Sequence, residues 1–321
     1  MSIEINEVAP LEIIRLKHPH APLTLPDTVV ALGFFDGVHR GHQKVIDVAK
    51  SEAKKRNIKS AVMTFFPHPK EVLRKEEQHT IQYLSPLPEK IELMEEMGID
   101  YLFIVTFDRF FADLSPQQFV DQYLIDLNVK HVVAGFDYSY GRLGKGTMET
   151  LPFHSRSQFS HSVVDQVSHG DEKISSTEIR QALNEGNMSK VNDYLGRPFN
   201  ISGKVVHGEK RGRTIGFPTA NIDPVERTVV PAKGVYACML ISQGRANLPS
   251  VCNVGYKPTF HDKSPLKPTI EVHVLNFNEN LYDEHVQVVF LGRIRGEEKF
   301  DSIEGLKKQI SADIEKAQQF Y

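Results

Sequence analysis

Short apolar runs alternate with amphipathic helical patterns over the first half of the chain, and this alternation limits the possible folds most. The strand-like runs are residues 29–34, 58–65, 101–107, 131–136 and 162–167. The helical patterns cover residues 41–55, 86–97, 116–127 and 176–183. Such an order predicts βαβ units, so we expect an α/β domain with a parallel sheet and helices on both faces.

The pattern changes near residues 184–203. A helix is expected at residues 187–195, ended by Gly196 and Pro198. Short β-rich runs broken by glycine, proline and asparagine then predict a small antiparallel barrel or sandwich, and residues 303–319 predict a closing helix. The β-rich runs are residues 201–206, 234–241, 249–254, 269–275 and 286–291. We therefore expect two domains, residues 1–186 and residues 187–321.

Composition narrows the class of protein. The 321 residues suffice for two cores, and a net charge of −3 gives no dominating basic field, so we expect no nucleic-acid partner. No apolar run has the length of a membrane span, and the N-terminus lacks the apolar core of a signal peptide, so we expect no membrane partner. Cys238 and Cys252 lie in apolar runs without metal-ligand spacing, which predicts buried free thiols and a cytoplasmic location. The sequence leaves the oligomeric state open, and a monomer is compatible with it.

Residues 33–42, called the histidine turn below, connect the first predicted strand to the first long helix. His39 and His42 are three residues apart, so both can point at one spot on a helix turn. A helix N-terminus favours anions, and Gly41 would let a phosphate approach the backbone. The turn therefore predicts a phosphate site, although the pattern His-x-Gly-His alone occurs fairly often by chance. Its further candidate phosphate-binding residues are Gly33, Phe34 and Asp36.

Other stretches in this half follow predicted strands. Residues 64–69 present His68 on a proline turn, and in isolation a plain surface histidine is the favoured interpretation. Residues 135–141 place Asp137 beside Tyr138 and Tyr140, which could stack a flat ring or simply pack. A basic loop, residues 142–146, comes next.

Residues 174–180 begin another predicted helix. Ser176 and Thr177 are ordinary residues for a helix start, but they could also hold a phosphate, with Arg180 one turn along as a charge clamp. Together with the histidine turn they suit attack on a nucleoside triphosphate, which depends on positioning and positive charge.

The second half contains the most specific stretch, residues 208–221. Its glycines and cations predict a flexible loop that can surround phosphates, and a solvated surface turn is the alternative. Thr219 and Asn221 are two apart on an expected strand, so their oxygens face one way and suit Mg²⁺. Glu271 lies on another expected strand, opposite in direction to Ile270 and Val272, and could act as a general base or belong to the wet face. The candidate phosphate-binding residues of the loop are Gly208, Arg211, Gly212 and Arg213.

These motifs, with residues 253–260, occur in an order that resembles the bacterial bifunctional riboflavin kinase/FAD synthetases over nearly the whole chain. The resemblance implies a Rossmann-like FMN adenylyltransferase domain over residues 1–186. It also implies a β-barrel riboflavin kinase domain with a terminal helix over residues 187–321. One reaction would phosphorylate riboflavin with Mg·ATP, giving FMN and ADP; the other would transfer AMP from ATP to FMN, giving FAD and pyrophosphate.

The resemblance also implies residue roles. His39 and His42 would hold the triphosphate, Glu271 would be the general base of the kinase, and Thr219 with Asn221 would bind Mg²⁺. The remaining implied positions are Ser176, Thr177 and Arg180 at the triphosphate, and His68, Asp137 and Tyr140 near flavin or nucleotide. Two departures are Tyr138 and Tyr140 where phenylalanine is common, and Asn276 in place of a frequent aspartate.

Three other interpretations stay open on the sequence. The chain could keep only one activity, or it could be a flavin-binding regulator without turnover. Met188-Ser189-Lys190 together with His-x-Gly-His is also similar to the paired signatures of class I aminoacyl-tRNA synthetases, which the charge does not support. Residues 152–161, including His154 and His161, match no motif and are expected at the surface.

Overall fold

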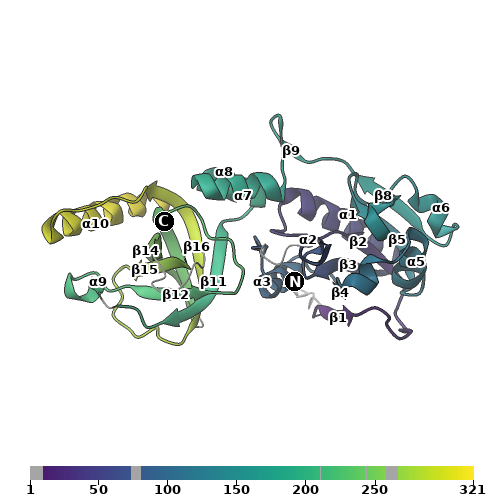
Figure 1. Cartoon of the computed structure of the whole chain (residues 1–321), viewed down its shortest axis with the longest axis horizontal. Helices are drawn as coiled ribbons and strands as arrows, with labels where there is room; N and C mark the ends of the chain where they lie inside the picture. Colours follow the sequence, from purple (N-terminus) through teal and green to yellow (C-terminus); the bar gives the residue numbers. More distant parts are fainter. Residues whose placement is uncertain (1–9, 74–80, 210, 243, 258–266) are drawn as a thin grey trace, which may run out of the picture. The chain divides into compact units, whose positions relative to one another are not determined.

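The computed structural model describes residues 10–73, 81–209, 211–242, 244–257 and 267–321 (Figure 1). The chain forms two compact units, Met1–Ile174 and Ser175–Tyr321. The expected boundary at residues 186 and 187 stays a prediction, because the end of one compact unit does not fix where a functional domain begins.

The described part of the first unit is built on a six-stranded sheet with the order β1-β4-β3-β2-β5-β8. Every neighbouring pair is parallel, as the alternation of strands and helices predicts. The strands are β1 (Glu12–Leu16), β2 (Thr28–Leu32), β3 (Lys59–Phe66), β4 (Tyr101–Thr106), β5 (Val129–Gly135) and β8 (Ser160–Val164). The sequence did not predict β1, because this edge strand exposes most of its side chains and carries no strong apolar pattern.

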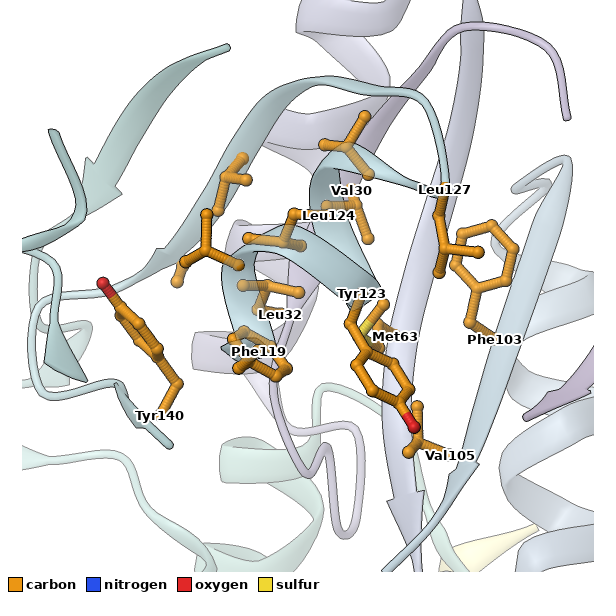
Figure 2. Close-up of a cluster of buried hydrophobic side chains, with 14 of the residues drawn as sticks. Val30, Leu32, Met63, Phe103, Val105, Phe119, Tyr123, Leu124, Leu127 and Tyr140 are labelled. Carbon is orange, nitrogen blue, oxygen red and sulfur yellow. The ribbon is translucent and has the colours of Figure 1, made fainter. Parts of the chain in front are cut away.

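Helices cover both faces of this sheet, which confirms the α/β prediction. Val30 and Leu32 point to one face, where they pack with Phe119 and Leu124, and Figure 2 shows this cluster. Val29 and Ala31 point to the other face, where they pack against the helix that follows β2. The helices are α1 (Arg40–Arg56), α2 (Pro69–Leu73), α3 (Leu87–Glu96), α4 (Arg109–Ala112), α5 (Pro116–Val120) and α6 (Leu151–Ser155).

Two predictions for the first unit need correction. The helix expected at residues 116–127 is α5 followed by a π-helical turn (Asp121–Ile125), in which the N–H of Asp126 bonds to the carbonyl of Asp121. Residues 152–161 are not simply surface, since α6 packs on the core and buries Ser155, and Phe159 is also buried. This unit also contains two short two-stranded sheets: β6 (Ser139–Tyr140) with β7 (Gly146–Thr147), and β9 (Ser168–His169) with β10 (Glu172–Lys173).

The second unit begins with α7 (Ser176–Glu185) and α8 (Met188–Leu195), then forms a closed antiparallel barrel with the order β11-β12-β15-β14-β13-β16. The barrel alternative of the prediction is therefore confirmed. Its strands are β11 (Phe199–Val206), β12 (Ala220–Pro224), β13 (Gly234–Ser242), β14 (Arg245–Lys257), β15 (Lys267–Val274) and β16 (His285–Arg295). The chain ends with the predicted helix, α10 (Ile303–Ala317), and a 3₁₀ turn (Gln318–Phe320).

Three local features refine the sequence analysis. The expected flexible loop contains a helical turn, α9 (Arg211–Thr214), and Thr219 lies one residue before β12 rather than on it. Cys238 and Cys252 are buried and unpaired, as predicted. Among the helices in the described residues, none combines the length and the apolar character that a membrane span requires.

Candidate active sites

The histidine turn follows β2, the strand at which the sheet order reverses between β3 and β5. In parallel sheets, ligands bind beyond the carboxyl ends of the strands at such a point. Phe35 and Val38 adopt left-handed backbone conformations, with φ of 53° and 40°, and both side chains are buried. The surrounding core thus holds the turn in a conformation that is unfavourable for branched and aromatic residues.

The side chain of Asp36 anchors this turn to a neighbouring segment of the chain. It is buried, and its Oδ1 accepts hydrogen bonds from the backbone N–H groups of Leu84 at 2.9 Å and Ser85 at 3.2 Å. These residues lead directly into α3. The carboxylate thereby connects the turn to the segment before α3, a structural task that its candidate role in phosphate binding did not anticipate.

His39 and His42 come together as the spacing predicts. Their rings stack with centroids 3.6 Å apart and planes inclined by 19°. His39 caps α1, because its Nδ1 accepts the backbone N–H of His42 at 3.3 Å. In the neutral ring this leaves the proton on Nε2 as a donor. Gly41 leaves room for the ring, since a Cβ there would lie 3.1 Å from Cε1 of His39.

His42 resists protonation. Burial, and then the charges of His39 and Lys90, hold the pKa of His42 well below its usual value. Two like charges about 4 Å apart repel by roughly 4 kcal/mol at an effective dielectric constant of 20. The Nδ1 atom of His42 is buried and has no hydrogen-bond partner among the described residues. His42 therefore presents a neutral ring at the helix start, with one polar atom that has no hydrogen-bond partner among the described residues.

Lys90 is a residue of this site that the sequence analysis missed. It lies on α3 and is only 3% exposed. Its Nζ donates to the Phe34 carbonyl at 2.7 Å and to Thr64 Oγ1 at 3.4 Å, and it lies 4.3 Å from the centre of the Phe34 ring. Burial lowers the pKa of Lys90 to about 8, against the opposing charge of Asp36. A lysine in a helical pattern normally signals a solvated face, so only the fold could reveal it.

His68 joins the site through Phe34. Their ring centroids are 4.3 Å apart in an edge-to-face arrangement. The Nδ1 of His68 accepts the backbone N–H of Lys70 at 3.0 Å, and its own backbone N–H donates to the Tyr83 hydroxyl at 3.1 Å. The proline turn thus places His68 beside the histidine turn.

Asp137 and Tyr140 follow β5 but lie in different surroundings. Asp137 is exposed and pairs with Lys173 at 2.9 Å. Tyr140 is 4% exposed and packs on Phe119, and its hydroxyl lies 2.8 Å from Nδ1 of His154. Most of the Tyr140 ring therefore serves packing, which was the alternative interpretation of this aromatic pair.

Ser176, Thr177 and Arg180 lie at the start of α7, in the second compact unit. The N-cap of α7 is Ser175, whose Oγ accepts the N–H of Glu178 at 3.3 Å. Ser176 and Thr177 thus occupy the first turn, where backbone N–H groups have no partner within the helix.

The barrel brings together residues that are far apart in the sequence. Asn221 on β12 is the direct partner of Glu271 on β15, and Glu271 is also the partner of Asn253 on β14. Directly opposite residues share a face of the sheet, with Cβ atoms about 5 Å apart. A carboxylate therefore stands between two amides. The buried neighbours Ile270 and Val272 confirm the predicted alternation of β15.

Gly208 passes close to the side chain of Asn221, and Gly212 passes close to the Phe217 carbonyl. A Cβ on Gly208 would lie 2.2 Å from Nδ2 of Asn221, and a Cβ on Gly212 would lie 2.2 Å from the Phe217 carbonyl oxygen and 3.5 Å from Oγ1 of Thr219. Only glycine allows such close passage. A second positioning contact was not predicted: Nδ1 of His273 lies 2.7 Å from the Pro218 carbonyl oxygen. A cavity of about 520 Å³ lies near the start of β12, with Val205, Arg213, Thr219, Phe277 and Tyr282 among its lining residues, whereas Asn221 and Glu271 are not among them. The cavity is also lined by Ala220 and Val272, which alternate with Asn221 and Glu271 along β12 and β15 and so lie on the opposite face of the sheet. Arg211 begins α9.

Comparison with known proteins agrees with this two-part arrangement. The FAD synthetase family model matches residues 22–178, and the riboflavin kinase family model matches residues 195–321. The bifunctional riboflavin kinase/FMN adenylyltransferase of Bacillus subtilis (strain 168) is 44% identical over 313 residues, which cover 97% of this chain and 98% of the relative. The chain belongs to this family.

Other members of the bifunctional riboflavin kinase/FMN adenylyltransferase family match over the same length. The proteins of Listeria monocytogenes and Escherichia coli K12 are 43% and 38% identical, each over 97% of this chain and 98% of the relative. A crystal structure described as a macrolide-efflux protein from Streptococcus pneumoniae shares the fold, with a TM-score of 0.89 and 36% identity over 96% of this chain and 99% of that one. The resemblance inferred from the motifs is therefore confirmed, although residues 258–260 of one motif lie outside the described residues.

Proposed function

We propose that the chain catalyses both reactions of its family, each in its own half. Residues 187–321 would phosphorylate riboflavin with ATP, giving FMN and ADP. Residues 1–186 would join the AMP of ATP to FMN, giving FAD and pyrophosphate. The proposed boundary between them is supported by the two family matches, which end at residue 178 and begin at residue 195. The observation that carries the proposal is that one chain of this family holds both a stacked histidine pair at a helix start and a glutamate paired with an asparagine beside a glycine loop.

In the adenylyltransferase half, the histidine turn would bind the triphosphate of ATP. A phosphate oxygen of FMN attacks the α-phosphorus, and the bond from that phosphorus to the bridging oxygen of pyrophosphate breaks. Negative charge grows on the leaving pyrophosphate, where Nε2–H of His39 and the start of α1 offer donors. Gly33, Phe34 and Gly41 would shape the phosphate site, and Asp36 would hold it.

The remaining candidates complete this proposal. Ser176, Thr177 and Arg180 would contact the triphosphate from the start of α7, where helix N–H groups favour anions. His68 and Asp137 would lie toward the flavin or the nucleotide. Tyr140 would contribute an edge at most, because its ring is largely buried.

In the kinase half, Glu271 would accept the proton of the ribityl 5′-hydroxyl as that oxygen attacks the γ-phosphorus of ATP. The phosphorus–oxygen bond to ADP breaks, and FMN forms. Gly208, Arg211, Gly212 and Arg213 would surround the phosphates. Fixing Glu271 on a strand between two amides supports this role, because a rigid base loses little entropy when the substrate arrives.

Thr219 and Asn221 fit a magnesium ion. A hydroxyl and an amide oxygen are hard ligands, and the close passage of Gly208 and Gly212 brings the phosphate loop against both side chains. When bound with ATP, Mg²⁺ would neutralise charge on the phosphate oxygens. The protein residues would hold the ion and keep the loop against it.

The further partners follow from these reactions. The substrates and products would be riboflavin, FMN, FAD, ATP and ADP, without nucleic acid or membrane. A cytoplasmic location is supported by the buried, unpaired state of Cys238 and Cys252.

Incubation with riboflavin, ATP and Mg²⁺, followed by separation of the flavins, tests the proposal. FMN and FAD should both accumulate. FMN without FAD would restrict the chain to a kinase. Unchanged riboflavin that nevertheless stays bound to the protein would instead identify a flavin-binding regulator.

A further inference from the structure

Lys90 places a buried positive charge against the carbonyl of Phe34 in the histidine turn. Its ammonium contacts only uncharged groups among the described residues, the oxygens of Phe34 and Thr64 and the Phe34 ring. The charge of Asp36 acts on it without forming an ion pair. Removing an ammonium from water is unfavourable unless another charge compensates for it. Asp36 compensates this cost only in part, since the pKa of Lys90 stays lowered, so the charge needs a further explanation.

Hydrogen bonds other than those of Lys90 already connect the histidine turn to the segment before α3. Asp36 accepts two backbone N–H groups from the segment that leads into α3. A neutral donor at position 90 could supply a further hydrogen bond to the Phe34 carbonyl at a lower desolvation cost. The hydrogen bond alone thus gives no reason for an ammonium at this place.

The charge of Lys90 has a role at this site because the neighbouring ring of His42 is held neutral. His39 uses Nδ1 as an acceptor, and the stacked pair cannot easily hold two protons. The site must nevertheless attract a polyanion. Lys90 acts electrostatically on His42, so its field reaches the place where that polyanion would bind.

We propose that Lys90 is a positioning residue for adenylyl transfer, which fixes the Phe34 carbonyl and supplies a positive charge that favours the triphosphate of ATP. Lys90 does not touch the substrate. It acts through the backbone of the histidine turn and through the ring of His42. The inference rests on the proposed adenylyltransferase function of this half.

Two substitutions separate charge from hydrogen bonding. Lys90→Gln keeps a donor and removes the charge, whereas Lys90→Met removes both. In each variant the KM for ATP in FAD formation and the Kd for inorganic pyrophosphate, measured by calorimetry, should rise by about tenfold or more. The KM for FMN should stay unchanged, which a general distortion of the domain would not allow.

Lys90→Arg provides the conservative rescue. It keeps the charge, so its affinity for pyrophosphate should lie within about threefold of the wild-type value. If the glutamine and methionine variants fail to fold, this variant alone decides, since loss of pyrophosphate binding with intact FMN binding would overturn the proposal.

The possible results distinguish the inference from the function on which it rests. A Lys90→Gln protein with wild-type affinities for ATP and pyrophosphate would show that the charge has no role. If the wild-type protein itself forms no FAD, the proposed adenylyltransferase function is wrong.

Discussion

Asn221 and Glu271 are direct cross-strand partners on β12 and β15, so their side chains lie on the same face of the barrel. Asn253 flanks Glu271 from β14. Neighbouring amides can hold the carboxylate in one orientation through hydrogen bonds. The pair thus joins the proposed magnesium ligand and the proposed general base in one rigid unit.

Glu271→Gln should abolish FMN formation while leaving FAD formation from supplied FMN intact. The amide has nearly the same shape but cannot accept the hydroxyl proton, so the kinase rate should fall by about 10²-fold or more. Separation of the flavins after incubation with each substrate measures both activities.

The same change at an exposed position is the matched control. Glu298 is exposed on the chain after β16, and Glu298→Gln should leave both activities unchanged. If Glu271→Gln removed both activities together, two separate sites could not explain the result.

His39→Asn tests whether the ring of His39 acts in adenylyl transfer beyond its role as N-cap. Asparagine is a good N-cap, so α1 should stay stable, but the Nε2–H donor is lost. FAD formation should fall by about 10²-fold or more, since one donor to a developing charge contributes that much. Riboflavin phosphorylation should not change.

His39→Ala removes the cap and the donor together. It should lower the free energy of unfolding by about 1 kcal/mol more than His39→Asn does, with a similar loss of FAD formation. Denaturant titration measures the first quantity. Full activity in His39→Asn would limit His39 to capping.

Gly208→Ala should impair the kinase, because the new methyl group would collide with Asn221, whose Nδ2 would lie 2.2 Å away. Moving either group disturbs the proposed magnesium site, so the kcat/KM for ATP in FMN formation should fall by about tenfold or more. FAD formation from supplied FMN should persist.

Gly296→Ala is the control for that experiment. A Cβ at Gly296 would have its nearest neighbour, Nη2 of Arg293, at 3.8 Å, which is ordinary contact. Its kinase activity should equal that of the wild-type protein. Equal activity in the Gly208 variant would mean that the loop adapts without cost.

The sequence predicted the histidine turn well because its signals are local. The β-branched run, the three glycines and the helical period all lie within about thirty residues of one another. The strand position of Glu271 also follows from simple alternation. Its pairing with Asn221 could not be read from the sequence, because the register of β12 and β15 depends on closure of the barrel.

Lys90 and Tyr140 show a second limit. Lys90 is 56 residues from the carbonyl that it holds, and its local pattern is that of an ordinary helix surface. Tyr140 stands in a motif that is compatible with either ring stacking or core packing, and tertiary packing buries it beside Phe119. Both outcomes depend on contacts between distant elements, which no local pattern encodes.

His131 should make the stability of the protein depend on pH. Burial, and then the charge of Arg56, lowers the pKa of His131 to about 4, while its ring bonds to Ser160 and Ser162. The unfolded chain takes up a proton near pH 6.5, and the folded chain does so only near pH 4. The contribution of His131 to the free energy of unfolding is therefore fully present above pH 6.5. It is lost as the pH falls toward 4, at a rate of up to about 1.4 kcal/mol per pH unit.

Denaturant titrations between pH 4 and pH 7.5 measure this dependence. His131→Gln keeps polar groups for the two serines but cannot titrate, so its free energy of unfolding should fall less steeply toward low pH. The exposed His169 gives the control, and His169→Gln should keep the wild-type slope. If His131 is held neutral in the folded protein, it must contribute to the loss of stability in acid. An unchanged slope in His131→Gln would therefore contradict this role and assign the acid sensitivity to other groups.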